Sequence, residues 1–345
     1  MKDSKGWDGK LRVERHAVLA NPEALEDPDE YSDEDAPPVE QIEADEDLLE
    51  DFEDDVDDID LVHCRISSLP ALHLERFTKL EKLCLRQNEI TRITLPESLA
   101  PTLTDLDLYD NMIAHIRGLD HLTNLTSLDL SFNNIKHIKN ISTLVKLTDL
   151  YFVQNRIQKI EGLEGLKVLR NLELGANRIR DIENLDDLTA LEELWLGKNK
   201  ITEIKNVTPL TNLKILSLPS NRLTSISGIS ALTNLEELYL SHNAIANISG
   251  LDSNPNLRVL DLSSNQISRL ENLSHLTNLE ELWASNNQLE SFDEVDKELR
   301  DKEKLTTVYF EGNLLQTKAP ALYRNKVRLA LPQVQQIDAT YVRVS

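Results

Sequence analysis

The chain has 345 residues, with 60 Asp and Glu against 37 Lys and Arg, and its formal net charge is −23. Strong acidity without a basic face argues against direct binding of nucleic acid. Two cysteines and the lack of an apolar stretch after the polar opening Met1 to Lys10 argue against secretion and against a membrane span, so we expect a protein of the nucleus and the cytoplasm.

The acidic charge is concentrated near the start of the chain. Residues 21–60 hold 21 Asp and Glu and no Lys or Arg. Like charges at this density repel one another and bury little apolar surface, so residues 1–50 are predicted to form an acidic, disordered leader. Such a charge run serves either as a solubilising tail or as a segment that binds a basic partner such as a histone, and the sequence leaves both interpretations open.

A ladder of asparagines dominates residues 51–317. Nine of them follow at intervals of 22 residues, without insertion or deletion: Asn111, Asn133, Asn155, Asn177, Asn199, Asn221, Asn243, Asn265 and Asn287. Asn88 precedes them by 23 residues, Asn313 follows by 26, and Cys64 takes the same place one unit earlier, which gives twelve units. A fixed period in this range predicts stacked repeats, each of which buries its apolar face against its neighbours.

The repeat that begins at Ile160 shows the predicted local structure. Its apolar residues lie three apart as far as Leu172, which suits 3₁₀-like turns, and then two apart, which suits an extended strand. The strand Leu172-Glu173-Leu174 should point both leucines into the core and Glu173 outward, while the amide of Asn177 satisfies backbone groups of adjacent coils. The pattern resembles the leucine-rich repeat, LxxLxLxxN/C. The resemblance implies an α/β solenoid, a horseshoe with a parallel concave sheet and short 3₁₀ or helical segments on its convex side.

Two segments near the C-terminus are predicted to be helical. Ser291-Phe292-Asp293-Glu294 is a capping-box pattern that opens a charged helical stretch to about Lys304. From Ala319 to Leu331, apolar residues recur near helical spacing before Pro332. Residues 318–345 are therefore predicted to cap the repeats, because the last coil would otherwise expose a strand edge and an apolar wall.

Motifs typical of catalysis are absent from the sequence. It contains no GxxxxGK[ST], HExxH, GxSxG or CxxC. His115 and His137 lie 22 residues apart, so they follow the repeat and do not converge as metal ligands. Cys64 and Cys84 take different places in the repeat, so no disulfide is expected. We therefore expect a protein that is not an enzyme and that carries no cofactor and no metal site.

The candidate functional surface consists of the strand residues that face outward beside the buried leucines. One row is Asp60, Cys84, Asp107, Asp129, Tyr151, Glu173, Trp195, Ser217, Tyr239, Asp261, Trp283 and Tyr309. A second row, two residues earlier on each strand, is Asp105, Ser127, Asp149, Asn171, Glu193, Ile215, Glu237, Val259, Glu281 and Thr307.

The composition of these rows favours a protein interface. A strand residue exposed to water has no packing reason to be Trp, whereas Trp and Tyr beside fixed charges are typical of interface centres. The alternative is that the aromatic side chains shield one another across neighbouring strands. Eight strand-to-strand steps from Asp129 to Tyr309 span about 40 Å, which fits a globular domain, and the carboxylates predict that its surface is basic.

Several segments resemble the leucine-rich-repeat regulatory subunit of type 1 serine/threonine protein phosphatase. They are Leu-Tyr-Leu-Ser-His-Asn at 238–243, Leu-Gly-Lys-Asn-Lys-Ile at 196–201 and Leu-Ala-Leu-Pro-Gln-Val-Gln-Gln-Ile-Asp-Ala-Thr at 329–340. The resemblance covers roughly residue 56 to the end. It implies a non-enzymatic subunit whose concave face binds the phosphatase catalytic subunit and which controls its maturation, activity or nuclear localisation.

The same resemblance implies which residues bind the phosphatase. The matching positions are Asp129, Tyr151, Glu173, Trp195, Asp261, Glu281, Trp283 and Tyr309. It also implies a ternary complex with a small phosphatase inhibitor protein. The alternative function is that of an acidic nuclear leucine-rich-repeat chaperone for histones or other basic proteins, which would act through the leader.

Overall fold

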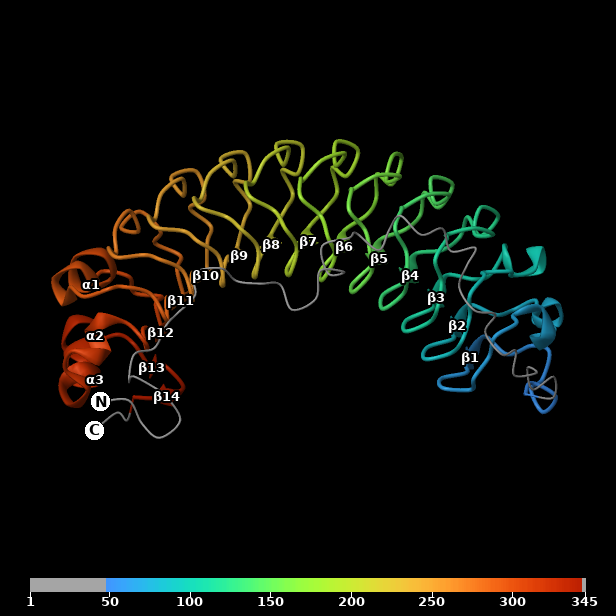
Figure 1. The fold of residues 1–345 in the computed structure, drawn as a ribbon, viewed down its shortest axis with the longest axis horizontal. Helices are drawn as coiled ribbons and strands as arrows, with labels where there is room; N and C mark the ends of the chain where they lie inside the picture. The colour runs from blue at the N-terminus through green and yellow to red at the C-terminus, as the bar shows by residue number, and fades with distance from the viewer. Residues whose placement is uncertain (1–47, 343–345) are drawn as a thin grey trace, which may run out of the picture. The chain divides into compact units, whose positions relative to one another are not determined.

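The computed structural model describes residues 48–342, which form one compact unit. Its core is a 14-stranded sheet whose strands follow one another in sequence order. The first twelve are parallel and three residues long: β1 Asp58–Asp60, β2 Lys82–Cys84, β3 Asp105–Asp107, β4 Ser127–Asp129, β5 Asp149–Tyr151, β6 Asn171–Glu173, β7 Glu193–Trp195, β8 Ile215–Ser217, β9 Glu237–Tyr239, β10 Val259–Asp261, β11 Glu281–Trp283 and β12 Thr307–Tyr309. The strands line the inner side of a curved solenoid (Figure 1), and the predicted horseshoe is confirmed.

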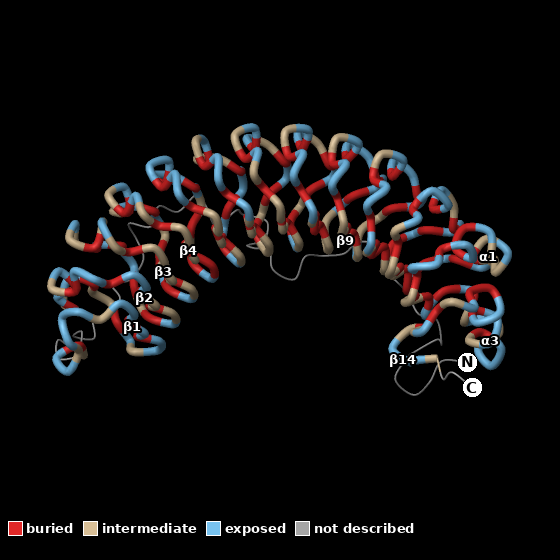
Figure 2. Tube along the Cα trace, turned by 180° about the vertical axis from the view of Figure 1, so that it is seen from behind, coloured by how far each residue is buried: buried red, intermediate tan, exposed pale blue. Residues whose placement is uncertain are grey.

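Every strand of the central repeats buries its middle residue. Leu172 is fully buried and pairs with the equivalent leucines Leu150 and Leu194 of the neighbouring strands. Strand β6 begins one residue earlier than the predicted 172–174, but the Leu174 amide still donates to the Trp195 carbonyl at 2.8 Å. Buried positions recur in every turn, and exposed positions occupy the outer loops (Figure 2). The leucines therefore form one continuous core along the stack.

The asparagine ladder satisfies backbone groups as predicted. The side-chain oxygen of Asn133 accepts from the Ile113 amide at 2.9 Å. Its side-chain nitrogen donates to the carbonyls of Leu108 at 3.0 Å and Leu130 at 3.2 Å. Buried Asn111 and Asn313 make equivalent bonds near the two ends of the ladder. One amide thus pairs groups of two adjacent coils that would otherwise be buried without partners.

The convex side contains fewer helical segments than the sequence predicts. The described 3₁₀ helices are η4 Pro70–Leu72, η5 Leu74–Arg76 and η6 Glu97–Leu99, all in the first repeats. Later repeats make isolated turns, such as the bond from the Leu166 amide to the Leu163 carbonyl at 3.3 Å. Each of these turns is closed by a single hydrogen bond. The next leucine, three residues along the chain, already points into the core, so the chain continues into the next turn and does not extend a helix.

One convex position takes glycine or asparagine because two coils approach closely there. Gly162 has φ +69°, and a Cβ atom on it would lie 2.2 Å from the Ile138 carbonyl oxygen. Asn184 takes the same place one repeat later with φ +57°, and its side chain donates to the Ile160 carbonyl at 2.7 Å. Both solutions accommodate a left-handed backbone conformation.

Alternating charges follow the edge of the sheet where the strands begin. The edge charge row, one residue before each strand, consists of Arg170, Glu192, Lys214, Glu236, Arg258 and Glu280. Lys214 lies 2.6 Å from Glu192, and Arg258 lies 3.0 Å from Glu280 and 3.4 Å from Glu236. Because these groups are exposed, each pair adds little stability, but the alternation avoids like charges in neighbouring repeats.

Helix α1, Phe292–Leu299, interrupts the repeat before β12. The Ser291 hydroxyl accepts from the Glu294 amide at 3.2 Å, which confirms the predicted helix start. The helix ends at Leu299, and the prediction of a helical stretch to about Lys304 is therefore wrong. After Leu299 the chain turns so that buried Lys302 donates to the carbonyls of Ser274 and Leu276, and burial lowers the pKa of its ammonium group.

The C-terminal segment covers the last repeat. It comprises α2 Leu314–Thr317, α3 Pro320–Ala330, β13 Gln336–Ile337, parallel to β12, and β14 Thr340–Tyr341, antiparallel to β13. Helix α3 buries Tyr323, Val327 and Ala330, whereas Leu322 is 56% exposed. The Tyr323 hydroxyl donates to Asp338 at 2.9 Å. At the other end, Leu49 is buried in the core, and most of the predicted leader lies outside the described residues.

Candidate functional site

The structure brings the eight candidate residues onto one face of the sheet. Seven of them occupy the third position of their strands, in register across the sheet: Asp129, Tyr151, Glu173, Trp195, Asp261, Trp283 and Tyr309. Glu281 occupies the first position of β11, beside Val259 and Thr307. Six of these seven third-position residues are half-buried, and Asp261 is only 6% exposed.

Four rings on this face form a continuous aromatic row: Trp195, Tyr239, Trp283 and Tyr309. Trp195 stacks on Tyr239 with ring centroids 6.2 Å apart, and Tyr239 meets the edge of Trp283 at 6.1 Å. Each of these pairs lies two strands apart and spans one small residue, Ser217 or Asp261, which explains why both small residues are buried. The rings therefore do shield one another, as the alternative interpretation holds, but each stays partly exposed.

Carboxylates on the same strands fix the orientation of the rings. The Trp195 indole donates to Glu193 at 3.2 Å, and the Trp283 indole donates to Glu281 at 2.9 Å. The Tyr239 hydroxyl donates to Glu237 at 2.6 Å. Because the polar tips of these rings already have partners, their conformations are set before any partner binds, which lowers the entropy cost of binding.

Tyr239 and its carboxylate were not among the eight candidates. Burial and the adjacent Glu237 raise the pKa of Tyr239 well above its ordinary value. The sequence does contain a signal for this residue, since Glu-Leu-Trp at 193–195, Glu-Leu-Tyr at 237–239 and Glu-Leu-Trp at 281–283 recur every 44 residues. The two intervening strands carry Ile215-Leu-Ser and Val259-Leu-Asp, which gives large and small residues on alternate strands.

The N-terminal part of the same face forms an acidic row, which we define as Asp105, Asp107, Asp129, Asp149 and Glu173. Arg86 lies 2.8 Å from Asp107 and 3.6 Å from Asp129, and it neutralises only part of this charge. Burial and the neighbouring Asp129 raise the pKa values of Asp107 and Glu173. Carboxylates held close together in this way favour a partner that brings positive charge.

The described residues provide no arrangement for metal or thiol chemistry. Residues 48–342 contain no group of three or more His, Cys, Asp or Glu placed to hold a metal ion. Cys64 and Cys84 are both free, and burial raises the pKa of the Cys84 thiol to about 11. Within the same residues, every helix is too short or too polar to cross a membrane.

Comparisons with known proteins define the class. Residues 126–225 match the family described as "Leucine-rich repeat", and residues 211–253 and 255–297 match "Leucine Rich repeats (2 copies)". An internalin (inlF) from Listeria monocytogenes has a TM-score of 0.65 at 25% identity, covering 83% of this chain and 88% of that chain. A leucine-rich-repeat protein from Leptospira interrogans has a TM-score of 0.60 at 26% identity, and the match covers 76% of this chain and 73% of that chain. The chain has the leucine-rich-repeat fold, a horseshoe with a parallel sheet.

Curated relatives narrow the class further. The chain is 57% identical over 91 residues to "Protein phosphatase 1 regulatory subunit SDS22" of Schizosaccharomyces pombe, which is 26% of each chain. It is 49% identical over 126 residues to the subunit of the same name in Saccharomyces cerevisiae, covering 36% of this chain and 33% of that one. For "Protein phosphatase 1 regulatory subunit 7" of Mus musculus the values are 59% over 54 residues, 16% of this chain and 14% of that one.

These matches bear on two predictions. The matched segments span about a quarter to a third of the length of the two yeast relatives. The predicted resemblance to leucine-rich-repeat regulatory subunits of type 1 protein phosphatase is confirmed. The relatives are named as regulatory subunits, which supports the prediction that this chain is not an enzyme.

Proposed function

We propose that this protein binds the catalytic subunit of type 1 serine/threonine protein phosphatase through the concave face of its sheet. The aromatic row carries the proposal, because its rings are partly exposed, contact one another and have their polar tips held by carboxylates. The names of the relatives support the choice of this phosphatase as the partner. The binding residues are Asp129, Tyr151, Glu173, Trp195, Asp261, Glu281, Trp283 and Tyr309, to which the geometry adds Tyr239.

The two parts of the face would contribute differently to binding. Large aromatic side chains in a pre-organised row supply most of the affinity when the partner excludes water from them. The acidic row would attract a basic surface of the phosphatase, which raises the association rate and fixes the orientation of the complex. A partner of about 40 Å would contact both parts at once.

The consequences for the phosphatase form part of the proposal. Binding would control the maturation, activity or nuclear localisation of the catalytic subunit, in the nucleus and the cytoplasm. A small phosphatase inhibitor protein would join the pair in a ternary complex. A curved solenoid supports such an assembly, because a partner on its concave face leaves its loops and convex side available.

The test is the double variant Glu281→Lys, Trp283→Ala, assayed by capture of the purified catalytic subunit. The double variant loses the Trp283 ring and replaces the carboxylate that holds it with a positive charge, so binding should weaken about 30-fold or more. The matched control is Glu164→Lys, Val168→Ala, which makes the same kinds of change at exposed positions outside the strands. Thermal unfolding of both variants shows whether they stay folded. Undiminished affinity of a folded double variant would remove the concave face from the mechanism.

A further inference from the structure

Four basic residues follow the asparagine ladder in consecutive repeats. We call Arg156, Arg178, Lys200 and Arg222 the basic rim; each comes directly after a ladder asparagine. Their backbone amides donate to the preceding repeat, for example Lys200 to the Ile179 carbonyl at 2.8 Å. The four side chains are thus carried by adjacent coils about 4.8 Å apart, and the rim spans about 15 Å.

The repeat pattern itself does not demand this charge. The same position carries Glu89, Met112 and Asn134 in the preceding repeats and Ala244, Gln266 and Gln288 in the following ones. Within residues 48–342, Arg156, Lys200 and Arg222 form no ion pair. Like charges on neighbouring coils repel one another, so Arg156, Lys200 and Arg222 do not stabilise the stack through their charges.

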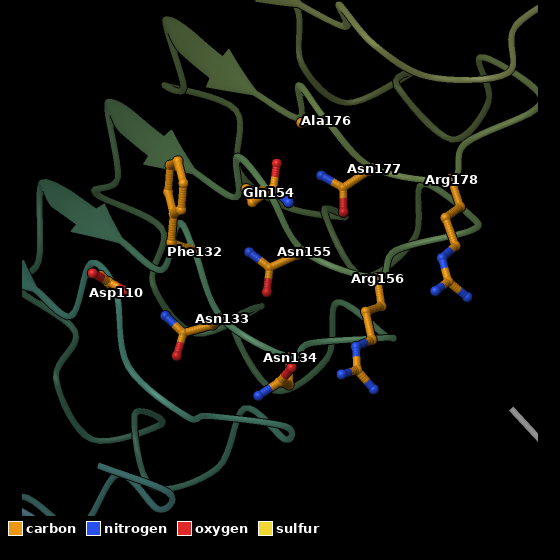
Figure 3. A pocket seen from close by; sticks show the side chains of 10 residues that line it. All are labelled: Asp110, Phe132, Asn133, Asn134, Gln154, Asn155, Arg156, Ala176, Asn177 and Arg178. Carbon is orange, nitrogen blue, oxygen red and sulfur yellow. The ribbon is translucent and has the colours of Figure 1, made fainter. Parts of the chain in front are cut away.

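An open groove of about 460 Å³ lies beside the first half of the basic rim. Figure 3 shows the side chains of Arg156 and Arg178 extending to the same side, beyond the ladder asparagines, with Phe132 standing farther along the groove. Phe132 is 39% exposed and packs on Tyr109 with ring centroids 4.7 Å apart. The groove therefore combines guanidinium groups with a supported apolar surface and the side-chain amides of Asn134 and Gln154.

We propose that the basic rim and this groove bind an extended acidic segment of a partner protein. Acidic residues at alternate positions of an extended chain recur about every 6.6 Å, so a segment of about five residues would match the length of the rim. Its carboxylates would pair with Arg156, Lys200 and Arg222, and an apolar side chain would pack on Phe132.

The arrangement of the cations favours carboxylates over a single phosphate. A phosphate is a compact charge and is held by basic groups that converge on one point, whereas the rim cations are distributed along a line. Nucleic acid fits less well, because the groove offers one exposed ring and the chain carries a net charge of −23. The rim lies outside the concave strands, so the proposal does not depend on phosphatase binding.

The experiment measures fluorescence anisotropy of a labelled twelve-residue peptide with Glu at alternate positions and one central Phe, using the full chain at low salt. The test variant is Arg156→Gln, Lys200→Gln, Arg222→Gln. The control is Lys139→Gln, Lys159→Gln, Lys167→Gln, which removes the same charge from three exposed positions outside the rim. We expect the test variant to bind at least about tenfold more weakly and the control less than about twofold.

Three outcomes would overturn the proposal: no binding by the unaltered chain, equal weakening in the two triple variants, or tighter binding of a matched peptide whose only negative charge is one phosphoserine. A further variant, Phe132→Ser, tests the apolar contact and should weaken binding about threefold while leaving the salt dependence unchanged. Since no phosphatase is present, failure here would leave the concave-face proposal standing, and the reverse also holds.

Discussion

The acidic row on β3 to β6 and the aromatic row on β7 to β12 lie on the same sheet and have the same backbone. Their buried leucines and ladder asparagines are equivalent. On the concave face they differ in the residues on either side of each buried leucine. In the acidic row, burial and the neighbouring Asp129 raise the pKa of Asp107; in the aromatic row, carboxylates hold the rings. Two of the 22 positions of a repeat can therefore change function while the core stays the same.

The largest expected effect tests whether the framework is equal in the two regions. Asn133→Ala and Asn265→Ala should each lower the free energy of unfolding by about 3 kcal/mol, because each leaves buried amide and carbonyl groups unpaired. Urea denaturation measures both. Asn124→Ala is the control, since its side chain bonds to carbonyls nearer the surface. Clearly unequal losses of unfolding free energy at Asn133 and Asn265 would show that the ladder does not stabilise the two regions equally.

The next effect concerns the aromatic row. Trp195→Ala should weaken phosphatase binding by about 2 kcal/mol, or about 30-fold, mainly through faster dissociation. The substitution also removes the ring that stacks on Tyr239 at 6.2 Å. Trp195→Phe keeps an aromatic ring and should retain most of the affinity. Surface plasmon resonance separates the two rates, and an Ala variant that dissociates as slowly as the unaltered chain would contradict the assignment.

The acidic row should act on association instead. Asp129→Asn with Glu173→Gln should slow association about tenfold at low salt and change dissociation little, because in the proposed complex these carboxylates would steer a basic partner. The difference should shrink as sodium chloride is raised, since exposed charges are screened. If the loss of affinity instead came from faster dissociation and persisted at high salt, the acidic row would hold the bound partner in the same way as the aromatic row.

The smallest effect is a pH dependence of stability with opposite signs at two glutamates. Burial and Asp129 raise the pKa of Glu173, so its contribution to stability is lost as pH rises through the raised value. Glu173→Gln should therefore be more stable than the unaltered chain near pH 7, and this advantage should fade toward pH 4. A hydrogen bond from Lys214 lowers the pKa of Glu192, so its contribution is present near pH 7 and lost as pH falls. Glu192→Gln should show the opposite trend. Denaturation midpoints of both variants, measured between pH 4 and 7, test the two predictions.

The sequence was sufficient to predict the repeats, the ladder and the position of the concave rows. It succeeded because leucine and asparagine recur at a period that only stacking satisfies, as the bonds of Asn133 illustrate. The start of α1 was predicted for a local reason, the cap at Ser291. Its end at Leu299 was not, because Lys302 is placed by tertiary contacts to the preceding repeat.

The contacts within the candidate surface were harder to predict. Tyr239 lies in the same row of the sequence, but its place in the site depends on the contacts of its ring with Trp195 and Trp283, which spacing does not reveal. Asp261 was expected to be exposed, and it is buried because the rings on either side lean over it. Spacing along a sequence gives the order of side chains on a sheet but not their tilt, which depends on the sizes of residues two strands away.

The edge charge row has a consequence for how such a molecule can gain or lose repeats. Excising residues 181–202 would set Arg170 beside Lys214 and bring together strands that now stand two apart. Excising residues 181–224 would instead set Arg170 beside Glu236 and restore the alternation of sign. Large and small residues on the concave strands alternate with the same period of two repeats. A pair of repeats, 44 residues, is therefore the unit that can be removed here while the alternation of charge along this edge is kept.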